Sequence, residues 1–262
     1  MTKYPKVIFS VNQEFEKEML RYNLIDEPSD SWNETLGRAY PELNKIINSD
    51  GDKAEPINEF VDRFYEKHGK EFETAAGVYQ KVWDPINDGV MQGLSEIIER
   101  EWDVDEVRGY LTLNPICPRF LETSSFQVTY SYAPETTKLV SLHEITHFLY
   151  FKKWKEVFPN EDEKKFNSPH LIWALSEILV APIDNDKRVR GYLSEDARSY
   201  SSYYWVKVKD GGRDTNVVEY FEKLYNTMIT EKKRPFAELL EEARKTVLGM
   251  RRNFEKTGIM LK

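Results

Sequence analysis

The spacing of apolar and polar residues divides the chain into a helical first part, a short β-rich middle and a helical last part. Residues 11–105 have the apolar spacing of helices, interrupted by turn-forming clusters at 26–29 and 48–51. Two amphipathic faces are expected there. They are formed by Ile57, Phe60, Val61, Phe64 and Tyr65, and by Val78, Val82, Ile86 and Val90.

The middle of the chain predicts two strands and then a helix. Residues 108–115 are β-rich and end at a turn. Residues 126–132 alternate large apolar or aromatic side chains with polar ones, which is typical of a half-buried strand. Pro134 begins the turn into a helix that continues to about Phe158.

A second helix with an apolar sequence is expected to begin at Ser168. Ser168 and Pro169 suit the N-cap and the first helical position. Pro182 is expected to end the helix, because proline lacks a backbone donor and clashes with the preceding turn. After Asp186 the chain is loop-rich, breaks at Gly211-Gly212, and predicts final helices at 216–229 and 235–255.

These elements together predict an α+β fold in which helix far outweighs strand. We expect a small sheet above two helices, helical subdomains at the sides, and a cleft between them. The expected division is an N-terminal helical subdomain over residues 1–105 and a second subdomain over residues 106–262, although one continuous domain is equally compatible with the length.

Composition limits the classes of partner and compartment. A formal charge of −8 and a sequence pI near 5.3 argue against nucleic-acid binding. No run approaches the roughly eighteen apolar residues that a membrane span needs. The first ten residues lack the apolar core of a signal peptide. Cys117 is the only cysteine, so no internal disulfide can form, and we expect a cytoplasmic protein.

One short motif indicates a chemistry. His143, Glu144 and His147 form the pattern H-E-x-x-H inside the expected helix that ends near Phe158. Two imidazoles four residues apart lie on one helix face, so they can bind one metal ion, and the glutamate between them can take a proton from a metal-bound water. The chain has only four histidines. Two buried structural histidines are the alternative, and the metal interpretation is preferred because the motif lies on a helix.

A catalytic zinc ion usually has a third protein ligand, and two residues on the next helix compete for that role. Glu177 is the only ionisable residue between Leu171 and Val180, where a lone carboxylate is costly to bury unless it is paired or binds a metal. His170 lies two helical turns earlier, about 10 Å away. Glu177 is therefore the expected ligand, and His170 either lines the cleft or is a half-exposed residue at the helix start.

The pattern of His143, Glu144 and His147, with Glu177 about thirty residues later, resembles the gluzincin zinc metallopeptidases. The resemblance covers roughly residues 107–186. It implies a zincin-like fold, Zn²⁺ bound by the two histidines and Glu177, and Glu144 as general base. The metzincin continuation fits worse, because Tyr150 and Lys153 stand where glycine and histidine are required.

The sequence departs from the thermolysin-like branch of that family at one position. Ala181 stands where that branch has an aspartate, so Asp184 or Asp186 is expected to substitute after the turn. The resemblance also implies an edge strand that holds an extended substrate by main-chain pairing, and residues 126–132 are the candidate.

The expected activity is zinc-dependent hydrolysis of a peptide or protein substrate. A further hydrogen-bond donor to the oxyanion is expected after the Glu177 helix. Four tyrosines are candidates, and none is preferred: Tyr192, Tyr200, Tyr203 and Tyr204. Two alternatives stay open, a regulatory zincin with a closed cleft and a non-catalytic binding module that keeps the fold and the metal. The presence of Glu144 favours an enzyme or a regulated enzyme over the binding module.

Overall fold

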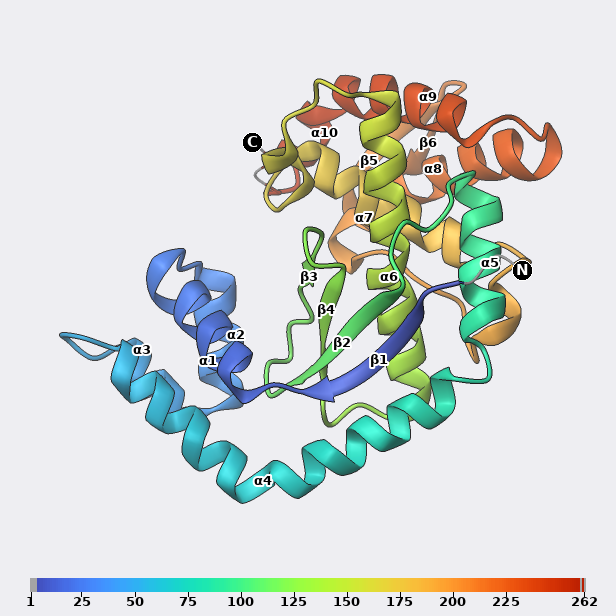
Figure 1. The fold of residues 1–262 in the computed structure, drawn as a ribbon. Helices are drawn as coiled ribbons and strands as arrows, with labels where there is room; N and C mark the ends of the chain where they lie inside the picture. The colour runs from blue at the N-terminus through green and yellow to red at the C-terminus, as the bar shows by residue number, and fades with distance from the viewer. Residues whose placement is uncertain (1–3, 260, 262) are drawn as a thin grey trace. The chain divides into compact units, whose positions relative to one another are not determined.

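The computed structural model describes residues 4–259 and 261, and they form a predominantly helical α+β structure with a small mixed sheet (Figure 1). The expected fold class is confirmed at this level. The chain groups into two compact units. We call residues 5–87 and 106–141 the sheet unit, and residues 88–105 with those from 142 onward the site unit. Each unit takes segments from both sides of residue 105, and the division expected there stays a prediction.

The sheet unit is built on four strands in the order β1-β2-β4-β3. Both β1 with β2 and β2 with β4 pair in parallel, whereas β3 is antiparallel to β4. The long helix α4 runs beside β1 (Figure 1). The strands are β1 (Lys6–Val11), β2 (Glu106–Thr112), β3 (Arg119–Phe120) and β4 (Ser125–Thr129).

Four helices of the sheet unit confirm the helical interpretation of the first part of the chain. They are α1 (Gln13–Arg21), which continues as a π-helical turn over Tyr22–Asp26, α2 (Asp30–Ala39), α3 (Pro41–Ile47) and α4 (Ala54–Trp83). The clusters at 26–29 and 48–51 fall in the breaks before α2 and α4, as predicted. Asn12 and Ser29 cap α1 and α2 by accepting hydrogen bonds from backbone N–H groups.

The second predicted amphipathic face is wrong, although the first is confirmed at all positions but the half-buried Phe64. Val78 is 38% exposed, and Val82 and Ile86 are half-buried. Val90 is buried as expected, but it lies on α5, beyond the end of α4 at Trp83. The larger side chains on the other side of the helix bury more apolar area, so they face the core instead. The buried face of this part of α4 is formed by Phe72, Ala76, Tyr79 and Trp83.

The strand expected over 126–132 differs from the prediction in two ways. All five residues of β4 are buried, so it is covered on both faces rather than one. It is also an internal strand, because β2 pairs on one side and Arg119–Phe120 on the other. The strand order thus places β4 inside the sheet, so the expectation that residues 126–132 form its edge strand is wrong. The neighbour β3 is short and pairs only with Ser125 and Phe126.

Three strand pairings were not predicted, and one of them is the short pairing of β3 with β4. Lys6–Val11 adds the strand β1 at one edge of the sheet, with Val7 and Phe9 buried and their neighbours more exposed. This alternation was present in the sequence but spans only six residues. The Gly211-Gly212 break is the turn of a hairpin between β5 (Lys207–Asp210) and β6 (Arg213–Asn216). Both glycines have positive φ, which glycine adopts without strain.

The site unit is mainly helical. Its main elements are most of α5 (Asn87–Ile98), α6 (Pro134–Val157) from Leu142 onward, α7 (Leu171–Asp184), the β5–β6 hairpin, α8 (Val217–Tyr225), a π-helical turn over Asn226–Glu231, α9 (Phe236–Gly249) and α10 (Arg251–Glu255). The end of α6 agrees with the expected helix to about Phe158. In the described part of the chain no helix is both long and apolar enough to cross a membrane.

The predicted ends of the Glu177 helix are wrong. The helix α7 begins at Leu171, and His170, rather than Ser168, is its N-cap. The segment before it forms a turn, in which the His170 N–H donates to the Asn167 carbonyl. The helix continues through Pro182 to Asp184. A proline in the last turn removes one backbone hydrogen bond near the helix end, where few depend on it.

Candidate metal centre

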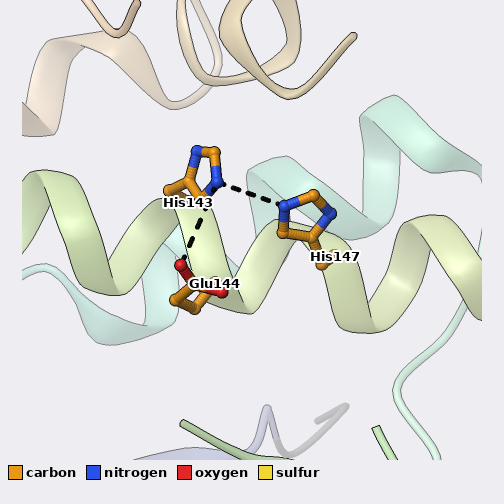
Figure 2. A group of neighbouring side chains, drawn as sticks. All are labelled: His143, Glu144 and His147. Atoms are coloured by element: carbon orange, nitrogen blue, oxygen red, sulfur yellow. Dashed lines mark hydrogen bonds and ion pairs between the residues drawn. The ribbon is translucent and has the colours of Figure 1, made fainter. Parts of the chain in front are cut away.

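The helix α6 presents the two motif histidines side by side. Their Nε2 atoms are 3.2 Å apart, although the rings are nearly perpendicular, with centroids 4.8 Å apart (Figure 2). His147 is fully buried, whereas the side chain of His143 is 24% exposed. The spacing of four residues on a continuous helix is what brings the rings together. The two nitrogens thus converge on one point, as predicted.

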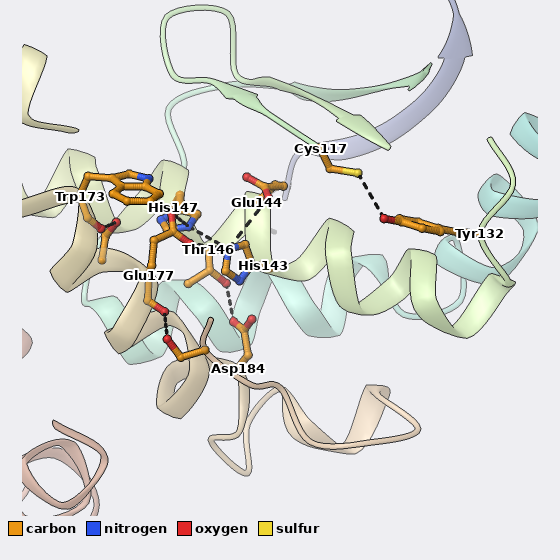
Figure 3. Close-up of polar contacts among 11 residues, drawn as sticks. Cys117, Tyr132, His143, Glu144, Thr146, His147, Trp173, Glu177 and Asp184 are labelled. Atoms are coloured by element: carbon orange, nitrogen blue, oxygen red, sulfur yellow. Dashed lines mark hydrogen bonds and ion pairs between the residues drawn. The ribbon is translucent and has the colours of Figure 1, made fainter. Parts of the chain in front are cut away.

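Glu177 reaches the same point from α7. Its Oε2 lies 3.0 Å from His143 Nε2, and its Oε1 lies 3.3 Å from His147 Nε2. The carboxylate is 1% exposed, because every residue of α7 except Trp173 is buried. The structure therefore brings together all three predicted ligands, from two helices of one unit (Figure 3).

The spacing of these donor atoms fits a small divalent cation. A tetrahedral ion with ligands at about 2.0 to 2.1 Å holds neighbouring donor atoms roughly 3.3 Å apart. The observed distances of 3.0, 3.2 and 3.3 Å are close to that spacing. Two nitrogens and one carboxylate are also a donor set that zinc takes in hydrolases, with a fourth position left for water. These residues could hold such an ion with small side-chain movements.

Glu144 belongs to the cluster but is placed differently. With His143 and His147 it forms a group whose potential ligand atoms lie within 4.8 Å of one another. Its Oε1 is 4.0 Å from His143 Nε2, which is longer than either Glu177 contact (Figure 2). Of the two carboxylates, Glu177 is the better ligand. Glu144 is beside the ligands, where a base acting on a bound water would lie.

The electrostatics of the cluster favour a cation among these three side chains. Burial alone would lower the pKa of His143, but the hydrogen bond and the charge of Glu177 outweigh it and raise the pKa to about 9. Burial would raise the pKa of Glu177, but the His147 charge and the bonds to both imidazoles hold it well below its usual range. The carboxylate is thus ionised, and in the protein alone a proton on the imidazoles balances it.

A hydrogen bond behind the motif links α6 to the end of α7. The Thr146 hydroxyl donates to Asp184 Oδ1 over 2.7 Å (Figure 3). Burial raises the pKa of Asp184 to about 7, although the His143 charge and the Thr146 bond oppose this. Its Oδ2 is buried, with no hydrogen-bond partner among the described residues. Asp184 thus contacts Thr146 inside the motif, and its substitution for the aspartate missing at Ala181 stays a prediction.

Asp186, the other residue expected to substitute there, is engaged elsewhere. Its carboxylate accepts two hydrogen bonds from the Arg188 guanidinium and one from the Tyr225 hydroxyl. Burial acts to raise its pKa, but these donors outweigh it and lower the pKa to about 2. Asp186 therefore holds the turn after α7, and only Asp184 contacts the motif.

The segment after α7 is hydrogen-bonded to the backbone of Glu177, and the sequence did not predict this contact. The Ser199 hydroxyl donates to the Glu177 main-chain carbonyl over 3.0 Å. Burial and then the Glu177 charge raise the pKa of Tyr203. Of the four tyrosines expected as donors, Tyr203 is 2% exposed, whereas Tyr200 and Tyr204 are 52% and 37% exposed. The tyrosine-rich composition was visible in the sequence, but the serine contact has no sequence signal.

His170 is a helix-start residue. It is the N-cap of α7, it is partly exposed, and its Nδ1 donates to the Asn167 carbonyl over 3.0 Å. Two helical turns separate it from Glu177. Of the two interpretations left open, the structure agrees with the half-exposed residue at the start of the helix.

Comparison of the chain with family models, with curated proteins and with solved structures gives no match. The geometry of this site is consequently the main indication of what the chain does.

Proposed function

We propose that this chain is a zinc-dependent peptidase of the gluzincin type, with the zincin-like fold that this implies. The observation that carries the proposal is the convergence of His143, His147 and Glu177 within 3.0 to 3.3 Å, with Glu144 beside them. A mixed sheet in one unit and two motif-bearing helices in the other are compatible with that fold. A peptide or protein substrate and a cytoplasmic location complete the proposal, which includes neither a nucleic-acid nor a membrane partner.

The residues of the site would act as metal ligands, as a general base and as positioning groups. His143, His147 and Glu177 would hold the ion, which when bound lowers the pKa of water toward neutrality and polarises a carbonyl group. Glu144 accepts the proton of the attacking water and returns it to the leaving amine. Asp184, acting through Thr146, fixes the turn of α6 that carries both histidines. The low exposure of Glu144, 7%, keeps bulk water from competing for its proton.

The experiment that tests this proposal is digestion of a complex peptide mixture by the zinc-loaded protein. New peptide termini should appear with zinc, disappear with a chelator, and return when zinc is restored. The Glu144→Gln variant is the matched control, because glutamine keeps the shape without a basic oxygen. Equal cleavage by the two proteins would show that a contaminant or a different group is responsible.

One observation favours the second candidate function, a regulatory zincin with little activity of its own. Glu144 and Glu177 are 7% and 1% exposed and His147 is fully buried, so His143 is the most exposed of the four site residues. A closed site of this kind would bind zinc at full stoichiometry and cleave peptides only after a partner or a change of conditions opened it. Zinc binding without cleavage of any peptide in the mixture would select this alternative.

A further inference from the structure

An aromatic surface adjoins the metal centre within the site unit. Trp173 is on α7 one turn before Glu177, so the two side chains lie on the same side of the helix. Figure 3 shows the Trp173 and Glu177 side chains, both carried by α7. Trp173 is also the one residue of α7 that is not buried. A partly exposed indole one helical turn from Glu177 is well placed to contact a substrate that reaches the site.

A second aromatic ring extends this surface. The ring of Tyr200 lies 6.1 Å from that of Trp173, inclined by 42°, and the side chain is 52% exposed. Tyr203 packs edge-on against Tyr200 at 5.9 Å, and Phe254 packs on Tyr203 from the core at the same distance. Tyr203 and Phe254 are 2% and 0% exposed. The exposed ring thus stands on a buried aromatic support.

The surface is held in place at the metal ligand itself. Ser199, next to Tyr200 in sequence, donates its hydroxyl to the main-chain carbonyl of Glu177. Trp173 and Tyr200 are thereby both fixed relative to Glu177, one through the helix and one through this hydrogen bond. A pair of aromatic rings fixed in this way loses little conformational freedom when a ligand binds.

From this placement we infer that Trp173 and Tyr200 form a specificity subsite for an aromatic or large apolar side chain next to the scissile bond. The inference rests on the proposed peptidase function and names its substrate class. The rings offer stacking and apolar area, and neither supplies a charge to pair with an acidic or basic side chain. Peptides with phenylalanine at that position should therefore be preferred over those with alanine or aspartate.

The test uses synthetic peptides that differ at one position only, carrying phenylalanine, leucine, alanine or aspartate. For the zinc-loaded protein, kcat/KM for phenylalanine should exceed that for alanine by about tenfold or more, as expected for one apolar side chain in a pocket. Both Trp173→Ala and Tyr200→Ala should reduce this ratio severalfold, mainly through KM, without loss of bound zinc. Trp205→Ala is the matched control, since Trp205 is 72% exposed in the same segment, and it should leave the ratio unchanged.

A binding measurement separates the subsite from the chemistry. The zinc-loaded Glu144→Gln protein should bind the fluorescein-labelled phenylalanine peptide about tenfold more tightly than the alanine peptide, by fluorescence anisotropy. A preference in binding without any cleavage by the unmodified protein would support the subsite and contradict the peptidase proposal. Cleavage or binding without aromatic preference, or a preference that persists in both Trp173→Ala and Tyr200→Ala, would overturn the subsite.

Discussion

Glu16 in the sheet unit and Glu177 in the site unit are each only 1% exposed, but the groups around them differ in kind. Glu16 accepts a hydrogen bond from the Thr112 hydroxyl at 2.8 Å and a longer one from Tyr65. Its neighbours are neutral, so burial dominates and raises its pKa to about 7. Glu177 lies between two imidazoles, and its pKa is lowered instead.

The comparison teaches that burial of a carboxylate does not by itself indicate a metal ligand. A buried glutamate among hydroxyls is most stable with its proton, and it offers little to a cation. A buried glutamate that faces two imidazole nitrogens is ionised, and together with these nitrogens it forms a set of three metal ligands. The neighbours, rather than the depth, distinguish the structural carboxyl from the candidate ligand.

Of the substitutions, Glu144→Gln should have the largest effect, which is on hydrolysis. Glu144 is a third glutamate of low exposure to set beside Glu16 and Glu177. Zinc should stay bound, because Glu144 lies outside the shortest contacts. Hydrolysis should fall by about 100- to 10,000-fold, the usual loss for a positioned general base. Single-turnover rates and metal content of the same preparation check both statements. Unchanged turnover that a chelator still inhibits would assign the base to another group.

Glu177→Ala should weaken zinc binding by more than the roughly 10- to 100-fold that is typical of residues behind a metal ligand. His170→Ala should change the affinity little, because His170 is an N-cap bonded to Asn167. Competition with a chromophoric chelator, at a pH where the ligand imidazoles are neutral, measures both. A large loss for His170→Ala and none for Glu177→Ala would replace the proposed ligand set with three histidines.

Glu16→Gln should affect stability and leave zinc affinity unchanged. The pKa of Glu16 in the folded protein is about 7, above its usual value of 4.5, so the folded state favours the protonated carboxyl. The stability that this carboxyl contributes is complete below pH 4.5 and is lost as the pH rises through 7. The difference amounts to about 3 kcal/mol of unfolding free energy. Relative to the unmodified protein, the variant should therefore gain stability between pH 5 and pH 8.

Urea unfolding at the two pH values measures this gain. The matched control is Glu14→Gln on the same helix, where the side chain is 82% exposed, and it should show no such pH-dependent gain. A variant that follows the unmodified protein at both pH values would mean that Glu16 is ionised when buried. Glu16 and Glu177 would then not differ in their charge when buried.

Asp184→Asn should have the smallest effect, a loss of zinc affinity of about tenfold. Thr146→Val, which removes the donor and keeps the shape, should give a similar loss, because the two residues share one hydrogen bond. Asp196→Asn, at a side chain 72% exposed, serves as the control. Additive losses in the Thr146→Val, Asp184→Asn double variant would indicate that the bond does not act as a unit.

Much of the fold and the site could be predicted from sequence where spacing alone determines the geometry. The i, i+4 histidines on one helix, the lone glutamate of an apolar helix and the breaks at 26–29 and 48–51 are of this kind. Glu16 could not be predicted as buried, because it lies among the polar residues of α1. Which face of α4 is buried, the internal position of β4, and the contacts of Ser199 and Asp184 depend on packing between distant segments, which local patterns do not encode.

We expect His143, His147 and Glu177 together to hold one zinc ion, and metal analysis of the purified protein tests this most directly. About one zinc per chain is expected for the unmodified protein, for Glu144→Gln and for Glu16→Gln. His147→Ala and Glu177→Ala should each lose most of the metal while keeping the helical circular dichroism of the unmodified protein. Full zinc content in His147→Ala, or none in the unmodified protein after zinc loading, would contradict the assignment.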